Sequence, residues 1–534
     1  MPTECQADSE VFPGMGRREV VARFDGGAIT SDAGGLLLRE VEARSGIIAR
    51  FARGFVDHRP PEQIEHTVEA RIRQRVSGWC LGSEDLHDHD ALRHDPLRAV
   101  LVGKADPTGQ DRAGRDQGKP LAGKRTLNRL ELTPVGANAD SRYQKIVARH
   151  SAREQSCVEI FIEPHATPPR EIVLDLDATD APGQGHPLGR FFQGDYREDG
   201  FLPRYIFCGQ YPRCAQLRPA DIEASAGSLK QVPKLVARRR PAWPEVVLTL
   251  RADSGFCREN LRSWCAAHNV RSLFGLPQNQ RLLKIIGRER QAAKRAFEQS
   301  GQASRVFADF TDRTQNSWSA ERRVVGKAEQ LSQGANPRFV VTHIPATERA
   351  ACELYEQDDC GRGGPTFGRC PENRIPEPQL CLFADRPRCR TLRANPLRLW
   401  FSTLADVVLN VLRERGLKGT PLATARCDMI RTKLLKIGAT VTVTVRKVWV
   451  QLASACPDRK VFARVWQNLR DGAPRRGSRP PSESLPPPGS TAPPPLVETS
   501  GPLAVTRPRS VSESIRLPDR DHHPLLRPRR PRSP

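Results

Sequence analysis

Two apolar segments, each running into an aspartate, constrain the fold of this 534-residue chain most strongly. Residues 171–178 read EIVLDLDA and residues 245–253 read EVVLTLRAD. Short runs of this kind, rich in valine, isoleucine and leucine and bounded by turn residues, predict buried strands. Helical patterns follow at residues 229–239 and 259–269. Strands that alternate with helices predict an α/β fold with a mixed sheet.

Composition and periodicity divide the chain into regions. Apolar residues recur at helical spacing over residues 62–82, whereas short β-like runs occupy residues 322–326 and 338–342. The last region is dominated by Pro, Ser and Arg and cannot bury enough apolar surface to offset the entropy of ordering. We therefore expect a disordered leader (1–19), a helical N-terminal region (20–150), an α/β region (151–470) with a charged, strand-containing segment at about 282–342, and a disordered Pro/Arg-rich tail (471–534).

The chain carries 84 Lys and Arg residues against 61 Asp and Glu residues, a formal net charge of +23. A surplus of this size favours a nucleic-acid partner, because each neutralised phosphate releases counterions. Exchange of Lys for Arg in a GC-rich genome would raise the arginine count but would not create a net surplus. Residues 471–534 hold 11 Arg against six acids, so most of the surplus belongs to the rest of the chain.

The 14 cysteines form none of the close pairs that zinc ribbons or redox sites need. The N-terminus has no secretory leader pattern, and no apolar run is long enough to span a bilayer. These features predict a cytoplasmic, nucleoid-associated protein with reduced thiols and no membrane partner.

The acids at the strand ends are candidate metal ligands. Asp177 ends the first strand, with Asp175 two residues earlier on the same face, and Asp253 ends the second strand. Two such carboxylates on neighbouring strands, joined by a third acid, can bind two Mg²⁺ ions for phosphodiester chemistry. The alternative interpretation is that acids at strand ends are ordinary loop starters and caps.

Several strings resemble, in family order, the IS1380-type transposases of the broader IS4-like DDE group. The resemblance extends from about residue 24 to residue 469. The strings are FDGGAITSDAGGLLLR (24–39), DLHDHDALRHDP (85–96), LAGKRTLNRLE (121–131), LDLDATD (174–180), LRADSGF (250–256), LFADR (382–386) and LRANPLRLWF (392–401).

The resemblance implies an RNase H-like mixed sheet with a β-rich insertion between the second and third catalytic acids. It assigns Asp177, Asp253 and Glu372 as catalytic residues and ligands of two Mg²⁺ ions, with Mn²⁺ as a possible substitute. It also implies DNA partners, namely transposon terminal repeats and target DNA, a DNA-binding role for the helical N-terminal region, and a homodimer on DNA.

The stretch around Glu372 departs from the family pattern. Asp359 occupies the place of a tyrosine, and extra residues separate Arg362 from Glu372. Pro376 and Pro378 would each cost about 3 kcal/mol inside a helix. Two alternatives therefore accompany an active transposase: a decayed, inactive copy that binds DNA without chemistry, and an RNase H-like nuclease that acts outside transposition.

Other charged residues have more ordinary interpretations. The cluster His87, His89 and His94 could bind a transition metal, but a surface or capping role is favoured. The basic segment 230–240 could hold phosphates or form a solvated helix face. Arg251, beside Asp253, could orient a phosphate or pair with an acid.

Overall fold

The computed structural model describes residues 9–149, 159, 167–179, 181–182, 191–193, 198–314, 317–358, 379, 381–383 and 395–471. Everything stated below concerns these residues. None of the helices in this part of the chain is both long and apolar enough to cross a membrane.

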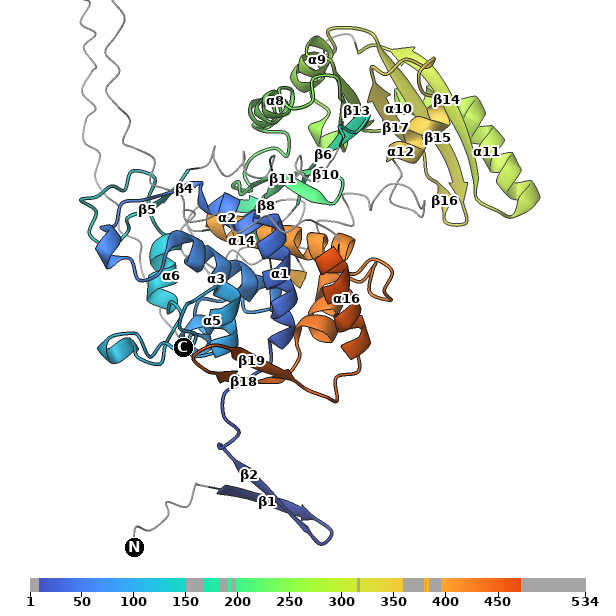
Figure 1. The fold of residues 1–534 in the computed structure, drawn as a ribbon. Helices are drawn as coiled ribbons and strands as arrows, with labels where there is room; N and C mark the ends of the chain where they lie inside the picture. Colours follow the sequence, from blue (N-terminus) through green and yellow to red (C-terminus); the bar gives the residue numbers. More distant parts are fainter. Residues whose placement is uncertain are drawn as a thin grey trace, which may run out of the picture. The chain divides into compact units, whose positions relative to one another are not determined.

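A nine-stranded mixed sheet forms the α/β part of the molecule (Figure 1). Its five-strand core pairs β6 in parallel with β12, and β12 in parallel with β13, whereas β10 and β11 are antiparallel. The strand order is β11 (Tyr211–Gln216), β10 (Arg204–Cys208), β6 (Glu171–Ala178), β12 (Val247–Ala252), β13 (Val270–Leu276), β17 (Arg338–Thr342), β15 (Arg322–Leu331) and β14 (Ser304–Asp312), with β16 (Gly334–Ala335) beside β15.

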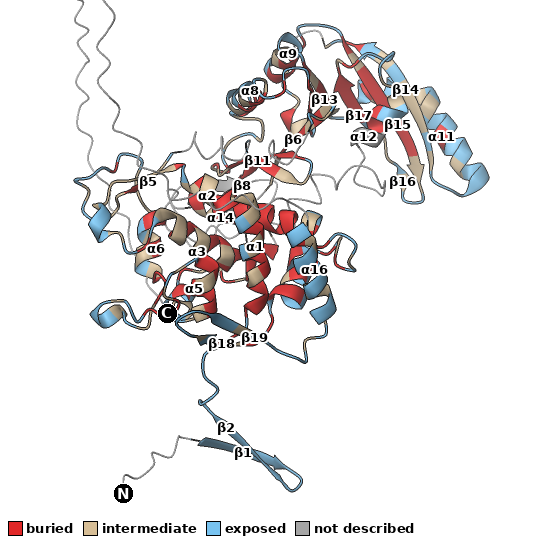
Figure 2. Cartoon of the chain, in the orientation of Figure 1, coloured by how far each residue is buried: buried red, intermediate tan, exposed pale blue. Residues whose placement is uncertain are grey.

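The parallel pairs are connected by the helices α8 (Ser228–Arg239) and α9 (Glu259–Ala267). Their apolar sides and the sheet bury a common core that includes Leu174, Leu250 and Phe274, each 0% exposed. Figure 2 shows the core strands as largely buried. Pro233 lies inside α8, beyond its first turn.

A segment between β13 and the end of β17 extends this sheet. It begins with α10 (Gln280–Ile285) and α11 (Gly287–Ser300), and the strands β14, β15 and β17 follow. The strands expected at residues 322–326 and 338–342 are confirmed, although the two helices make the segment mixed rather than purely β. The helix α12 (Ala351–Asp358) comes after it.

A separate helical core combines segments from both ends of the chain. The buried cluster contains Leu37, Ile72 and Phe401, which come from α1, α3 and α14. The structure therefore places residues 395–471 with the N-terminal helices, whereas the sequence had grouped them with the sheet. Its helices are α1 (Leu36–Ser45), α2 (Ile47–Ala52), α3 (Val68–Cys80), α4 (Asp88–Leu92), α5 (Pro96–Val102), α6 (Lys124–Glu131), α14 (Asn395–Val411), α15 (Cys427–Ile430) and α16 (Arg459–Asp471).

Short elements complete the described chain. The 3₁₀ turns are η1 (Ala33–Gly35), η2 (Pro61–Gln63), η3 (Gly114–Asp116) and η4 (Ser254–Phe256), and η6 (Leu412–Gly416) and η7 (Arg431–Leu435) are π-helical turns. Small sheets join β3 (Ile29–Thr30), β18 (Ala439–Val443) and β19 (Val448–Leu452); β4 (Phe55–Asp57) and β5 (Ile146–Ala148); and β7 (Ala181–Pro182), β9 (Glu198–Phe201) and β8 (Phe191–Gln193).

The N-terminal segment also differs from expectation. Residues 9–19, expected as part of a disordered leader, belong to a hairpin of β1 (Ser9–Met15) and β2 (Arg18–Arg23). Gly16 has φ +62°, the left-handed conformation that lets a tight hairpin turn close. All residues of both strands are exposed, so the hairpin has no burial pattern that the sequence could reveal.

Candidate active site

The two aspartates at the strand ends lie side by side. In the parallel pair β6–β12, Arg251 is opposite Asp175 and Ala252 is opposite Leu176. The next position on each strand is Asp177 and Asp253, respectively. Because neighbouring strands are about 4.8 Å apart, these two residues lie next to each other at the carboxyl edge of the sheet.

Asp253 is fixed by the turn that follows its strand. It is the N-cap of η4, and its Oδ1 atom accepts a hydrogen bond from the Gly255 N–H at 3.0 Å. The residue is exposed, so its carboxylate is held by the backbone yet open to solvent. A strand end that leads into a capped turn thus gives a rigidly held, accessible carboxylate.

Gly275 on β13 supports this turn from the next strand, a role that the sequence analysis missed. A Cβ atom built on Gly275 would lie 2.9 Å from the Ser254 backbone nitrogen and 3.2 Å from the Asp253 carbonyl carbon. A glycine inside a strand pattern is the signal of close backbone approach that could have revealed it.

We expect Gly275→Ala to reduce any metal-dependent activity by about 10- to 100-fold, because the new methyl group must displace the backbone of the Asp253 turn. Gly287→Ala is the matched control, since a Cβ atom at that position meets nothing within 4 Å. Activity and circular dichroism of the two variants would be compared. Equal activities would show that the position of this turn does not matter.

Asp177 occupies the corresponding position on the central strand. It is half-buried, and its Oδ1 atom accepts a hydrogen bond from the Ala178 N–H at 2.7 Å. On its other side it is in register with Tyr205 of β10, which is buried. The strand at the centre of the five-strand core therefore determines where this carboxylate emerges.

Asp175 and Arg251 form a buried ion pair behind the two aspartates. Arg251 Nε donates to Asp175 Oδ1 at 2.6 Å, and the two residues are opposite each other in the parallel pair. Arg251 is 8% exposed and Asp175 is 2% exposed. Of the two roles considered for Arg251, the structure therefore shows the pairing with an acid.

Glu372 lies outside the described residues, so the structure does not place the third acid. One observation bears on its neighbourhood: Gln379 Nε2 donates to Thr179 Oγ1 at 2.9 Å. Thr179 lies two residues after Asp177, and Gln379 lies seven residues after Glu372. The chain thus returns to the end of β6 shortly after the candidate third acid.

The donor set fits a hard divalent cation. Asp177 and Asp253 offer carboxylate oxygens from neighbouring strand ends, the ligands that Mg²⁺ and Mn²⁺ prefer. Within the described ranges no group of three His, Cys, Asp or Glu residues could hold a metal ion.

The histidine cluster does not form a metal site in the described part of the chain. His89 is 1% exposed, which corrects the expected surface or capping role. Its ring contacts Gln74 Nε2 at 3.2 Å and Arg75 at 3.0 Å, and burial lowers the pKa of His89 well below its ordinary value. His87 is exposed beside Asp85. His89 is thus a neutral part of the buried helical core.

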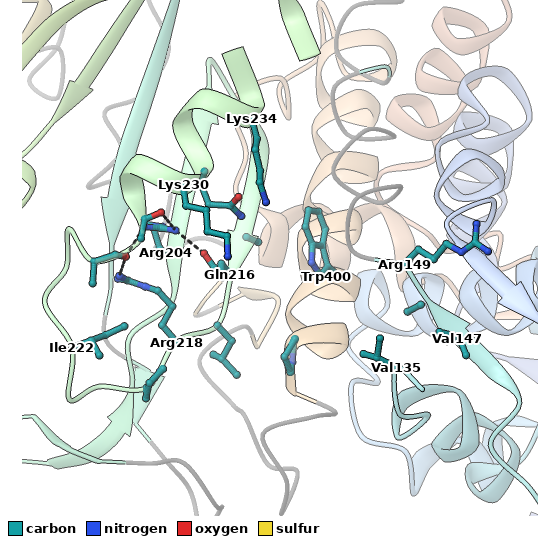
Figure 3. A pocket seen from close by; sticks show the side chains of 18 of the residues that line it. Val135, Val147, Arg149, Arg204, Gln216, Arg218, Ile222, Lys230, Lys234 and Trp400 are labelled. Atoms are coloured by element: carbon teal, nitrogen blue, oxygen red, sulfur yellow. Dashed lines mark hydrogen bonds between the residues drawn. The ribbon is translucent and has the colours of Figure 1, made fainter. Parts of the chain in front are cut away.

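The basic segment 230–240 has exposed and buried cations. Lys230 and Lys234 are exposed and line a pocket of about 1040 Å³ together with Arg204 and Arg218 (Figure 3). Arg239, in contrast, is 1% exposed, and burial lowers its pKa. Part of the segment is therefore buried against the core, and the two lysines are open to solvent.

The strand order and strand directions of the five-strand core define an RNase H-like fold. Comparison with known families agrees: the model of the family described as transposase DDE domain group 1 matches residues 12–473. The chain belongs to this family.

Two further comparisons were made, with curated proteins and with solved structures. No curated protein matches the sequence. Among solved structures, the chain is similar to piggyBac transposase in a synaptic complex with hairpin DNA, with a TM-score of 0.36 and 11% identity over 83% of this chain and 82% of the other.

Proposed function

We propose that this chain is a DNA transposase of the IS1380 type that cleaves DNA at transposon ends and joins those ends to target DNA. The observation that carries the proposal is the side-by-side position of Asp177 and Asp253 at the carboxyl ends of parallel strands. Family membership supports the same reaction class. The net charge of +23 supports DNA as the partner.

In the proposed reaction, a water oxygen attacks a phosphorus atom at the transposon end, and the bond to the 3′-oxygen breaks to leave a free 3′-hydroxyl. That hydroxyl then attacks a phosphorus atom in target DNA and displaces its 3′-oxygen. Asp177, Asp253 and Glu372 would hold two Mg²⁺ ions, which supply charge neutralisation and activation of the attacking oxygen.

The residues around the carboxylates keep the reacting groups in place. The backbone N–H of Gly255 orients Asp253, and the Asp175–Arg251 pair fixes the adjacent strand positions. Positioning of this kind is the main contribution a protein makes to phosphodiester chemistry. We further propose that the active species is a homodimer, since strand transfer joins two ends.

The second candidate is a copy that binds DNA without cleaving it. The prolines at positions 376 and 378, close to Glu372, favour this alternative. The bond between Gln379 and Thr179 supports the active form, because it returns the chain to the Asp177 strand.

Cleavage of supercoiled plasmid that carries the element's own flanking repeats tests the proposal. We expect end-specific nicking with Mg²⁺ or Mn²⁺ that EDTA abolishes and that Asp253→Ala lacks. Binding without cleavage in either metal would establish the inactive alternative. Metal-dependent cleavage without dependence on the repeats would instead establish a nuclease that acts outside transposition.

A further inference from the structure

A second pocket lies in the helical part, formed by α3, α4, α6 and the loops on either side of them. It has a volume of about 950 Å³ and lies within the N-terminal 150 residues. Its wall holds eleven Lys and Arg residues against three acids. They are Arg59, Arg71, Arg93, Arg112, Arg115, Lys119, Lys124, Arg125, Arg129, Arg142 and Lys145, with Glu65, Asp90 and Asp116.

The three acids are already engaged by neighbouring cations. Glu65 pairs with Arg112, Asp116 with Arg93 at 3.1 Å, and Asp90 with Lys124 at 3.5 Å. In the described chain no carboxylate pairs with four of the arginines: Arg71, Arg125, Arg129 and Arg142. The pocket thus retains a strong positive charge that its own acids do not neutralise.

The floor of the pocket holds a buried cation that is poorly compensated. Arg71 is 6% exposed, and its Nε atom has no hydrogen-bond partner among the described residues. Burial and the nearby Arg59 lower the pKa of Arg71 to about 10, although the Asp57 carboxylate acts in the opposite direction. Burial of a guanidinium without a directly paired carboxylate costs free energy, and an anion bound from outside would offset that cost.

The pKa of His66 is also lowered by the positive charges of this pocket. This floor residue is 5% exposed, and burial together with Lys104, Arg112, Arg71 and Arg93 lowers its pKa to about 2. A neutral imidazole adds no positive charge but can still donate one hydrogen bond. The pocket therefore combines fixed cations with a neutral polar group.

At the rim, two arginines are arranged around an aromatic ring. Arg129 and Arg142 lie 5.1 and 5.0 Å from the centre of the Tyr143 ring. Arg125 precedes Arg129 by one helical turn on α6, and both are exposed. Guanidinium groups held in this way lose little freedom when they bind a phosphate oxygen.

We infer that this pocket binds the phosphate backbone of DNA, with Arg125, Arg129 and Arg142 at the rim and Arg71 at the floor. The inference rests on the proposed function, which supplies the DNA, but the pocket is distinct from the carboxylates. Phosphate contacts of this kind position the protein on the duplex, whereas base contacts specify sequence.

The test measures the affinity of the full chain for a labelled DNA duplex a few helical turns long, in EDTA, at several salt concentrations. Arg125→Gln/Arg129→Gln should weaken binding about 10- to 100-fold. It should also reduce the slope of log K against log salt by about 2, one unit for each lost phosphate contact. Because no metal is present, the result does not depend on catalysis.

Arg290→Gln/Arg295→Gln on α11 is the matched control, since it removes the same charge from two exposed positions outside the pocket. Equal effects of the two double variants would overturn the inference in favour of a general charge effect. Equal loss of affinity for an RNA duplex of the same sequence would overturn the assignment to DNA. If the wild-type chain does not cleave DNA but the pocket variants still lose DNA binding, the proposed reaction is overturned and the DNA-binding role of the pocket is not.

Discussion

Replacing Asp253 with asparagine should reduce DNA cleavage by more than about 1000-fold, a rise of at least about 4 kcal/mol in the activation barrier. The asparagine keeps an Oδ1 atom that can accept the hydrogen bond from Gly255, so the turn is retained. The negative charge that would hold a cation is lost. The rate of plasmid nicking and the far-ultraviolet circular dichroism of the variant provide the measurement.

A cysteine at the same position separates a metal ligand from a structural residue. Asp253→Cys should lose cleavage in Mg²⁺ and recover part of it in Mn²⁺, because a thiolate is a softer ligand that Mg²⁺ accepts poorly. Wild-type protein in the two metals is the control. Equal loss in both metals, with binding intact, would contradict a ligand role for Asp253.

Breaking the buried pair of Asp175 and Arg251 should cost about 3–5 kcal/mol in the free energy of unfolding. Arg251→Leu leaves Asp175 as a buried charge without the partner that now lies 2.6 Å away. The double variant Asp175→Leu/Arg251→Leu removes both charges and should recover most of the loss, since a hydrophobic pair of similar volume is often as stable. Urea unfolding of the two variants and the wild type measures both effects.

The exposed pair of Arg258 and Glu223 is the control for this experiment. Their nitrogen and oxygen atoms are 3.0 Å apart, but both side chains face solvent. Arg258→Ala should leave the unfolding midpoint unchanged, because exposed ion pairs contribute little. A double leucine variant as unstable as the single one would show that Asp175 stabilises the sheet without Arg251.

Local pattern was sufficient to find β6, β12, β17 and the first part of β15. The apolar runs that form β6 and β12 are short, rich in valine and leucine and bounded by turn residues, and an aspartate lies at or next to the end of each. The helix α3 was found in the same way, since its apolar residues recur at helical spacing. For Glu372, sequence gave a candidate through resemblance, and its position remains a prediction.

Contacts between distant segments could not be read from the same patterns. The sequence of helix α14 shows that it is apolar enough to be buried on nearly all sides, but not which segments pack against it. Its packing partners include the N-terminal helices α2 and α3. These helices hold Phe51 and Ile72, which lie more than 300 residues away in the chain. His89 was misjudged for the same reason, because its polar neighbours in sequence gave no sign of burial.

The sequence by itself determined the strands, the two aspartates at their ends and the positive charge, because each depends on residues close together in the chain. The tertiary structure decided which strands are neighbours and therefore that Asp177 and Asp253 lie next to each other. It also decided that Arg251 forms an ion pair with Asp175 and that Gly275 packs against the backbone of the Asp253 turn. Pairing and close approach are set by packing across the sheet, and no local pattern records them.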